Sequence, residues 1–156
     1  MRLLVLLLFI SHTATAQKKW TAVNRNDILV YSFMTASGAA DGVNQAIIHH
    51  EYGLNNQFWD YAKSWKNKYK DFDAGDKRAA FLGSKTIFVG FTDGFHLTRM
   101  IDKGFTLAAI SISAYDLKLY KKKDRWKVVA KKLVISTLLN RIAFALTYNN
   151  LEGPFK

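Results

Sequence analysis

The chain has 156 residues and a formal net charge of +11, because 23 lysines and arginines outnumber 12 aspartates and glutamates. It contains no cysteine, which excludes disulfides, thiolate chemistry and zinc sites built on sulfur. Its single proline, Pro154, favours helices, since a β protein of this size usually has several prolines in its turns. Length and composition together predict one modest domain.

The N-terminus begins Met1-Arg2, continues with the apolar run LLVLLLFI and reaches Ala14-Thr15-Ala16. A positive start, a short apolar core and a small-x-small end are typical of a secretory signal peptide. The run is too short to predict a transmembrane span, and an uncleaved anchor is the alternative. We therefore expect a signal peptide at residues 1–16 and one helical membrane domain at residues 17–156. An exported chain is not expected to bind nucleic acid.

The stretch from Asp27 to His50 predicts a helix of roughly 22 residues, long enough to cross a bilayer at ~1.5 Å per residue. Asn26 or Asp27 is expected to cap this helix. Gly38 and Gly42 stand four residues apart, and this G-x-x-x-G spacing lets two helices approach closely. The helix also carries a polar ridge of side chains that share one face, namely Ser37, Asp41, Gln45 and His49.

Aromatic residues and lysines intermingle in the next stretch, from Glu51 to Lys85. The segment Trp59–Tyr69 is expected to form a short amphipathic helix on the membrane surface, with its aromatic side chains in lipid and its lysines in water. Residues Phe72–Gly83 are expected to form a loop, and Ser84 is expected to cap the next helix.

Two further apolar segments follow, Thr86–Ala114 and Leu133–Tyr148. Asp102-Lys103-Gly104 interrupts the first segment, which predicts either one long helix with a polar centre or two short segments bent at Gly104. The basic stretch Lys118–Lys132 lies between the two segments and is expected to bind the anionic headgroups of membrane lipids.

The three long segments are apolar on most sides, and Trp, Tyr and Lys flank their ends as they do at bilayer interfaces. We therefore expect an all-α fold in the cell inner membrane. It would be a small bundle of three to four mostly apolar transmembrane helices plus the amphipathic interfacial segment, with a homo-oligomer as one option. A soluble periplasmic helical domain is the alternative, since the mean hydropathy of the chain is only −0.07.

The expected topology contains a conflict. Signal cleavage would place Gln17 outside and, after one crossing, would place the lysines of Lys63–Lys85 inside. The more basic stretch Lys118–Lys132 should also lie inside, so an even number of crossings must separate the two basic regions. A hairpin bent at Gly104 meets this requirement, although each arm would have only about 14 residues, which is short for a span.

Acid–base and metal-binding residue types occur in or beside the apolar segments, namely Asp41, His49, His50, Asp93 and His96. Asp93 and His96 are three residues apart and would share a helix face, as carboxylate and imidazole ligands do in helical bundles. Two histidines and two carboxylates would suit a divalent metal such as zinc, iron or manganese, whose bound water could hydrolyse an ester or amide. Without metal, the Asp–His pair could act as a general base.

The same polar side chains could instead form a structural hydrogen-bond network, or they could line a path for ions or protons. Isolated charges at membrane depth are unfavourable by roughly 2.5–3.5 kcal/mol each on insertion scales, so we expect them to pair. Asp41 or Asp93 is expected to face Arg99 or Arg141. Ser37 and Gln45 complete the expected network.

Three stretches, SGAADG at 37–42, NNQFWDYAKSWKNKYK at 55–70 and FTDGFHLTR at 91–99, resemble a group of small bacterial and phage proteins expected to be membrane-embedded. The shared patterns are SGxxDG, NxQFWDxxxSWKNKYK and TDGxHLxR. The resemblance implies a membrane architecture and no particular activity. The group often has Glu where this chain has Gln45, so a metal site here would lack one carboxylate.

The sequence thus predicts an exported small integral membrane protein with an intramembrane network of Asp, His and Arg, and it does not indicate an activity. One alternative is a metal-dependent membrane hydrolase that acts on lipid or envelope substrates. The other is a soluble periplasmic helical binding module.

Overall fold

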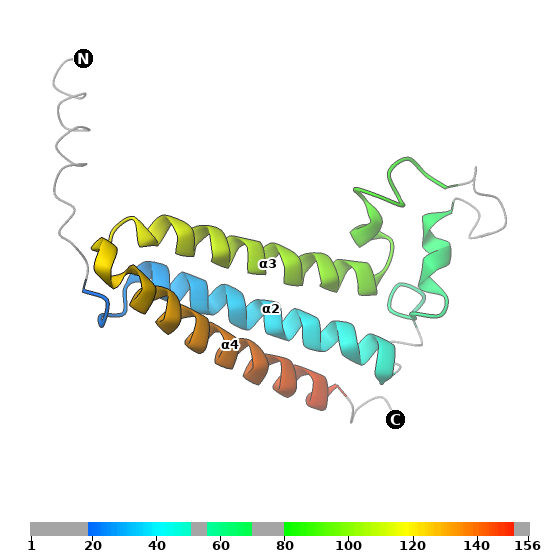
Figure 1. The fold of residues 1–156 in the computed structure, drawn as a ribbon. Coiled ribbons are helices and arrows are strands. Elements are labelled where there is room, and N and C mark those ends of the chain that lie inside the picture. The colour runs from blue at the N-terminus through cyan, green and yellow to red at the C-terminus, as the bar shows by residue number, and fades with distance from the viewer. Residues whose placement is uncertain (1–18, 51–55, 70–79, 152–156) are drawn as a thin grey trace, which may run out of the picture.

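Three long helices run side by side in the computed structural model, which describes residues 19–50, 56–69 and 80–151 (Figure 1). They are α2 (Arg25–His49), α3 (Gly94–Leu117) and α4 (Arg125–Asn150). The short 3₁₀ helices are η1 (Ser64–Lys68), η3 (Val89–Phe91) and η4 (Lys122–Asp124). The predicted all-α bundle is confirmed, since the described residues form no strand beyond one isolated bridge, Tyr69 to Ala80.

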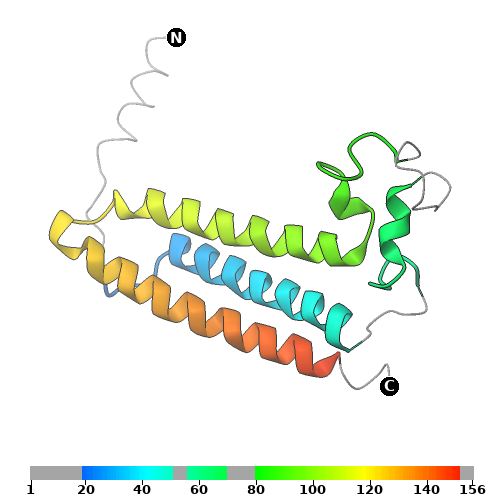
Figure 2. The same ribbon diagram turned by 45° about the vertical axis from the view of Figure 1, so that its right-hand side comes forward.

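Helix α2 lies between the other two, which make few contacts with each other. Helix α3 runs antiparallel to α2, and α4 runs parallel to it (Figures 1 and 2). Residues 19–24 and the turn from α3 to α4 meet at one end of the bundle, which we call the basic end. The last turn of α2, the last turn of α4, η1, η3 and the start of α3 gather at the opposite end, which we call the histidine end.

A capping box begins α2. The side chain of Asn24 accepts hydrogen bonds from the backbone N–H of Asn26 at 2.8 Å and of Asp27 at 3.2 Å, and the Asp27 carboxylate accepts one from the Asn24 backbone N–H at 3.2 Å. Asn24 is therefore the cap, and the expectation of Asn26 or Asp27 in that role was wrong. The predicted helix over residues 27–50 is confirmed within two residues at its start and one at its end.

The two glycines of the G-x-x-x-G motif face α4, as their spacing predicts. A Cβ atom added to Gly38 would collide with the backbone oxygen of Asn140, and one added to Gly42 would lie 2.8 Å from the backbone oxygen of Phe144. Only glycine permits this approach of the two backbones. On the other side of α2, the rings of Phe33 and Phe105 stack with centroids 5.6 Å apart and join α2 to α3.

Helix α3 is continuous from Gly94 to Leu117, so the hairpin bent at Gly104 does not form. The polar residues expected to break the helix do not break it, because Asp102 points inward and accepts a hydrogen bond from Ser37 at 2.6 Å. Asp93 caps the helix by accepting from the His96 backbone N–H at 2.8 Å, whereas Ser84, the expected cap, donates to the Lys68 carbonyl. One helix therefore separates the two basic regions.

Two other expected elements differ from the structure. Trp59–Tyr69 forms turns and the five-residue η1 in place of an amphipathic α-helix. Helix α4 starts at Arg125, eight residues before the expected Leu133, so the second half of the basic stretch is helical. The predicted signal peptide at residues 1–16 and residues 72–79 of the predicted loop lie outside the described residues.

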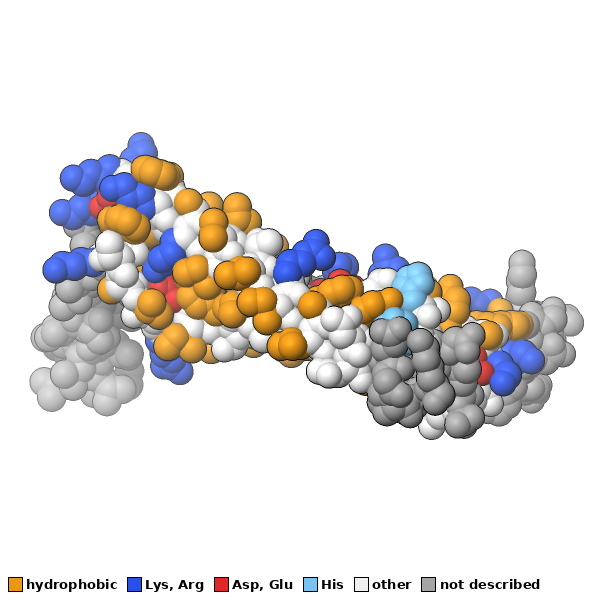
Figure 3. All heavy atoms as spheres, turned by 90° about the horizontal axis from the view of Figure 1, so that it is seen from below, with side chains coloured by type: hydrophobic (Ala, Val, Ile, Leu, Met, Phe, Trp, Pro, Cys, Tyr) orange, Lys and Arg blue, Asp and Glu red, His pale blue; other side chains and the backbone are white. Residues whose placement is uncertain are grey.

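The bundle buries polar side chains and exposes large apolar ones. Its fully or nearly fully buried polar residues include Asp27, Ser37, Asn44, Thr98, Asp102, Asp116, Lys132 and Ser136. Large apolar side chains cover the outside of α3 and α4, where Leu107 is 65% exposed and Leu133 is 66% exposed. Figure 3 shows such side chains along the middle of one face, with lysines and arginines gathered at the basic end.

When each helix is considered by itself, none in the described part of the chain is both long enough and apolar enough for a membrane span.

Candidate functional site

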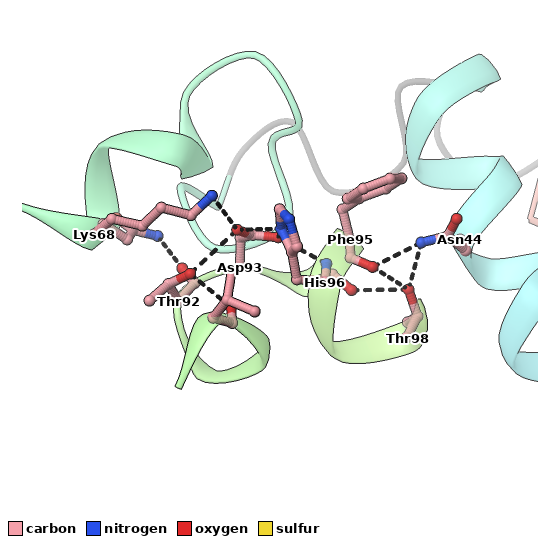
Figure 4. Close-up of polar contacts among 10 residues, drawn as sticks. Asn44, Lys68, Thr92, Asp93, Phe95, His96 and Thr98 are labelled. Carbon is pink, nitrogen blue, oxygen red and sulfur yellow. Dashed lines mark hydrogen bonds and ion pairs between the residues drawn. The ribbon is translucent and has the colours of Figure 1, made fainter. Parts of the chain in front are cut away.

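The first turn of α3, at the histidine end, holds Asp93 and His96 in contact (Figure 4). Nδ1 of His96 lies 2.7 Å from Oδ1 and 2.8 Å from Oδ2 of Asp93. Asp93 is 1% exposed, whereas the His96 side chain is 35% exposed. The i, i+3 spacing that the sequence singled out therefore produces a buried carboxylate against a partly accessible imidazole.

Three further groups surround the Asp93 carboxylate. Its Oδ1 accepts the His96 backbone N–H, and its Oδ2 accepts the Thr92 hydroxyl at 3.2 Å. The ammonium group of Lys68 lies 3.9 Å from Oδ2 and is mostly buried, so it supplies positive charge without close contact (Figure 4). The carboxylate is thus held in one orientation by short bonds, with the Lys68 ammonium farther away.

The segment before α3 is fixed by contacts with residues 56–69. The backbone N–H of Gly94 donates to the Phe58 carbonyl at 2.8 Å, and Asn67 donates to the Thr92 carbonyl at 2.8 Å. A Cβ atom on Gly94 would collide with the ring of Trp59, so glycine is required there. These contacts bring Lys68 toward Asp93 from 25 residues away in the chain.

Asn44 joins α2 to the same turn of α3. Its side-chain amide donates to the Phe95 carbonyl at 2.7 Å and to the Thr98 hydroxyl at 2.9 Å (Figure 4). Asn44 is 5% exposed, and the sequence analysis did not identify it. The available sequence signal was an amide within an apolar helix, seven residues after Ser37 and therefore on nearly the same helix face.

This arrangement suits a general base. A carboxylate that accepts the Nδ1 proton fixes the imidazole tautomer and leaves Nε2 as a proton acceptor. No described residue makes a hydrogen bond with Nε2 of His96. The same carboxylate also caps α3, so Asp93 has a structural role whether or not the imidazole takes part in chemistry.

The five residues proposed as metal ligands do not come together. Within the described ranges there is no group of three or more His, Cys, Asp or Glu residues that could hold a metal. His49 is exposed, and His50 instead packs on the Tyr148 ring of α4 with centroids 4.1 Å apart. Asp93 and His96 are the two candidates that meet, because a separation of three residues suffices for contact at a helix start.

The expected pairing of aspartates with arginines is also absent. Asp41 is half-buried and forms no hydrogen bond or ion pair with a described residue. Arg99 lies over the Phe95 ring at 5.9 Å, and Arg141 is exposed without a described acidic partner. Asp93 has Lys68 at 3.9 Å in place of an arginine, and Asp41 has no cationic partner among the described residues.

Of the remaining network residues, Ser37 lies inside the bundle and Gln45 does not join it. The Ser37 hydroxyl donates to Asp102, lies 2.9 Å from the Thr106 hydroxyl, and accepts from the Asn140 amide at 3.3 Å. This group links all three helices near their middle. Gln45 is half-buried and makes no hydrogen bond with the described part of the chain.

The sequence analysis missed a buried ion cluster at the basic end, made of Asp27, Asp116, Lys131 and Lys132. The Lys132 ammonium lies 2.8 Å from Asp116 and 3.2 Å from Asp27, and the Lys131 ammonium lies 2.9 Å from Asp27. Both carboxylates are fully buried, and Lys132 is 4% exposed. Two aspartates and two lysines balance, so the interior of this end carries no net charge.

Polar neighbours complete the basic end. Asn26 donates to Asp116 at 2.7 Å, and Asn24 donates to the hydroxyl of Tyr120 at 2.7 Å. Burial, together with the nearby charges of Asp116 and Asp27, raises the pKa of Tyr120 from 10.0 to about 12. The available sequence signal was Asp116, an acid at the end of an apolar helix, with Lys132 placed just before another apolar run.

Comparison of the chain with protein-family models, with curated proteins and with solved structures found no match.

Proposed function

We propose that the protein works as a membrane-embedded three-helix bundle whose basic end contacts anionic lipid headgroups. The observation that carries this proposal is the inverted distribution of its side chains. Charged and hydrogen-bonding groups lie between the helices, where they pair with one another, and large apolar side chains face outward. Membrane proteins follow this pattern because lipid, unlike water, favours apolar groups at the surface.

An apolar belt lies on the outside of all three helices, in the half of the bundle next to the basic end. We define the belt by its exposed members Ile28, Leu29, Leu107, Ile110, Val129, Leu133, Val134 and Leu138. On α3 the belt extends from Gly104 to Leu117, which is about 20 Å at 1.5 Å per residue. Exposed cations bound it, with Lys118, Lys121, Lys122, Lys123 and Arg125 on one side and Arg99, Lys103 and Arg141 on the other.

Buried ions contribute to the modest hydropathy of each helix, together with exposed charges such as Arg99, Lys103 and Arg141. Asp27, Asp116 and Lys132 lower the mean hydropathy of α2, α3 and α4, although none of them would contact lipid. The long apolar stems of Arg99 and Lys103 allow their charged groups to reach the interface from the edge of the belt. The relevant property for membrane insertion is therefore the composition of the outer surface of the bundle.

The fold also bears on orientation. Residues 19–24 and the lysine-rich turn share the basic end, where Lys131 donates to the Ala22 carbonyl and Lys127 lies over the Trp20 ring. A signal peptide cleaved after Ala16 would place this end outside, whereas its lysines favour the cytoplasmic side. The two expectations exclude each other in this fold. We propose the cytoplasmic orientation, because an excess of Lys and Arg in short loops sets the orientation of membrane proteins.

Alkaline carbonate extraction of cell membranes tests the membrane placement. We expect the wild-type chain to stay with the pellet, and the double variant Leu133→Lys/Leu138→Lys to move to the supernatant, because each lysine in the belt is unfavourable by roughly 2.5–3.5 kcal/mol in lipid. Asn149→Lys, at an exposed position beyond the belt, is the matched control and should stay in the pellet. Release of the wild-type chain would contradict the proposal and favour the soluble binding module.

The Asp93–His96 pair supports a second candidate function, hydrolysis of a lipid or envelope ester with His96 as general base. The observation in its favour is a buried carboxylate that orients a partly exposed imidazole. A metal-dependent version would require a further ligand beyond these two residues, and the described residues do not provide one. In the metal-free version His96 would take a proton from the attacking water, whereas in the metal-dependent version it would serve as a ligand.

A chromogenic acyl ester provides the assay for this second function. His96→Ala should lower the rate about 10²–10⁴-fold, the range for loss of a general base. His49→Ala, which removes an exposed histidine from the same end, should leave the rate unchanged. Equal rates for both variants and the wild type would contradict the hydrolase proposal. Loss of activity after addition of a chelator would favour the metal-dependent version.

A further inference from the structure

An open groove of about 440 Å³ lies between α3 and α4. It exists because these two helices pack against α2 and make few contacts with each other. Val30 of α2, Ala109 and Leu117 of α3, and Val129 and Leu133 of α4 contribute to its lining. A volume of this size lies in the range of ~300–1,000 Å³ typical of ligand sites.

Small side chains keep the groove open. Ser113 on α3 and Ser136 and Thr137 on α4 line it, where larger side chains would close the gap between the helices. Most of the lining is nevertheless apolar, so water gains little there and an apolar occupant is favoured. The described residues provide no side chain that fills the space.

The length of the groove matches one leaflet of a bilayer. Its lining on α3 extends from Thr106 to Leu117, about 17 Å at 1.5 Å per residue. One leaflet contributes about 15 Å, half of the ~30 Å hydrocarbon core. The groove begins at the basic end, since Leu117 directly precedes Lys118, and it reaches toward the middle of the bundle.

Positive charge lies just beyond that end of the groove. The exposed lysines there are Lys118, Lys121, Lys122 and Lys123. Each lysine near an anionic membrane surface contributes about 1 kcal/mol of attraction. A molecule with an apolar tail and an anionic head would therefore place its tail in the groove and its head at this turn.

We propose that the groove between α3 and α4 holds an acyl chain of an anionic phospholipid, with the headgroup phosphate at the lysines of the basic end. This inference rests on the membrane placement proposed above and adds one specific lipid position to it. It differs from general contact between the apolar belt and the bilayer, because it assigns one chain to one groove.

Photolabelling tests this assignment. The purified chain is reconstituted in vesicles of equal parts phosphatidylcholine and phosphatidylglycerol, with a photoreactive group in the acyl chain of the phosphatidylglycerol. We expect labelling to concentrate on residues 109–117 and 129–137. Ser113→Phe fills the groove and should lower this labelling at least tenfold, whereas Ser111→Phe, two residues away and outside the lining, should leave it unchanged.

The headgroup is tested with the same assay. Moving the photoreactive chain to phosphatidylcholine should reduce labelling of the groove several-fold. Replacing the four lysines of the turn by glutamine should abolish this difference between the two lipids. Equal labelling by both lipids in the wild type would contradict the role of the anionic headgroup.

The other outcomes separate the two proposals. A chain that floats with the vesicles but is labelled evenly along the belt, including Leu107 and Leu138, overturns the groove and leaves the membrane placement standing. A chain that does not float overturns the membrane placement, and the lipid site with it. Disulfide-linked dimers of Ser113→Cys, in a chain without other cysteines, would assign the groove to a second copy. If Ser113→Phe does not fold, the wild-type labelling map decides alone.

Discussion

The two ends of the bundle both bury aspartates, but they neutralise them differently. At the basic end, Lys131 and Lys132 approach Asp27 and Asp116 to 3.2 Å or less. At the histidine end, Nδ1 of His96 lies 2.7 Å from the Asp93 carboxylate, whereas the Lys68 ammonium lies 3.9 Å from it. The carboxylates of the ion cluster are fully buried, whereas the His96 ring is partly exposed and no described residue makes a hydrogen bond with its Nε2. The difference is the reason for assigning a structural role to the first end and for proposing proton transfer at the second.

The largest expected effect concerns Lys132, which joins both buried aspartates. Lys132→Met should destabilise the bundle by about 3–5 kcal/mol, because two carboxylates lose their shared cation in a buried site. Thermal unfolding in detergent, followed by circular dichroism, measures the change. Lys123→Met, which removes an exposed lysine from the same end, should stay within about 0.5 kcal/mol of wild type. Equal effects of the two substitutions would show that the ion cluster has no structural role.

The middle of the bundle joins the two ends, and its glycines test whether that connection is rigid. Gly38→Ala should destabilise by about 1–3 kcal/mol, because the new methyl group meets the Asn140 backbone, which cannot move aside without separating α2 from α4. Gly104→Ala is the control, since nothing lies near that position and alanine favours a helix by roughly 0.5–1 kcal/mol. Denaturant unfolding should therefore shift in opposite directions for the two variants. Stabilisation by both would contradict the close packing.

At the histidine end, substitutions of Asp93 separate capping from proton transfer. Asp93→Ala should destabilise α3 by about 1 kcal/mol, the usual loss of a helix cap, whereas Asp93→Asn keeps a cap and should preserve most of the stability. If His96 is a general base, Asp93→Asn should still reduce ester hydrolysis, because the amide no longer accepts the Nδ1 proton in the same way. Stability from unfolding curves and rates from the ester assay are compared for the two variants. If Asp93 has only a structural role, the rate of ester hydrolysis should fall only in the variant that loses stability.

A pH dependence is expected at the basic end, and only at strongly alkaline pH. The pKa of Tyr120 is raised from 10.0 to about 12, so its contribution to stability is complete below pH 10 and is lost as the pH rises through about 12. Tyr120→Phe cannot ionise, and the free energy of unfolding of wild type should fall more than that of the variant across this window. The free energy of unfolding of wild type and variant is compared at about pH 10 and about pH 12. The comparison separates the tyrosine from the lysines, because the lysines titrate in both chains. Parallel curves would contradict the buried position of Tyr120.

Much of the architecture follows from short-range sequence patterns. Long helices were predicted because apolar character persists over four turns or more in each segment. Gly38 and Gly42 predicted a close helix contact on α2, but they did not identify α4 as the partner. The Asp93–His96 contact was predictable for the same reason, since three residues at a helix start fix the geometry. The predicted metal site does not form among the described residues, because its expected ligands lie on separate helices that do not bring them together.

Only the tertiary structure decided which helix faces meet. Helix periodicity shows that Ser37, Asp41 and Gln45 share one side of α2, but α2 packs between two partners and therefore buries two faces. Ser37 turned inward, Asp41 stayed half-buried, and Asn44 became the link to α3. The ion cluster joins Asp27 to Lys131 across 104 residues, a distance that local pattern does not specify. The sequence alone therefore determined the helices and one local pair, whereas packing determined which charges are neutralised, since neutralisation depends on contacts between distant parts of the chain.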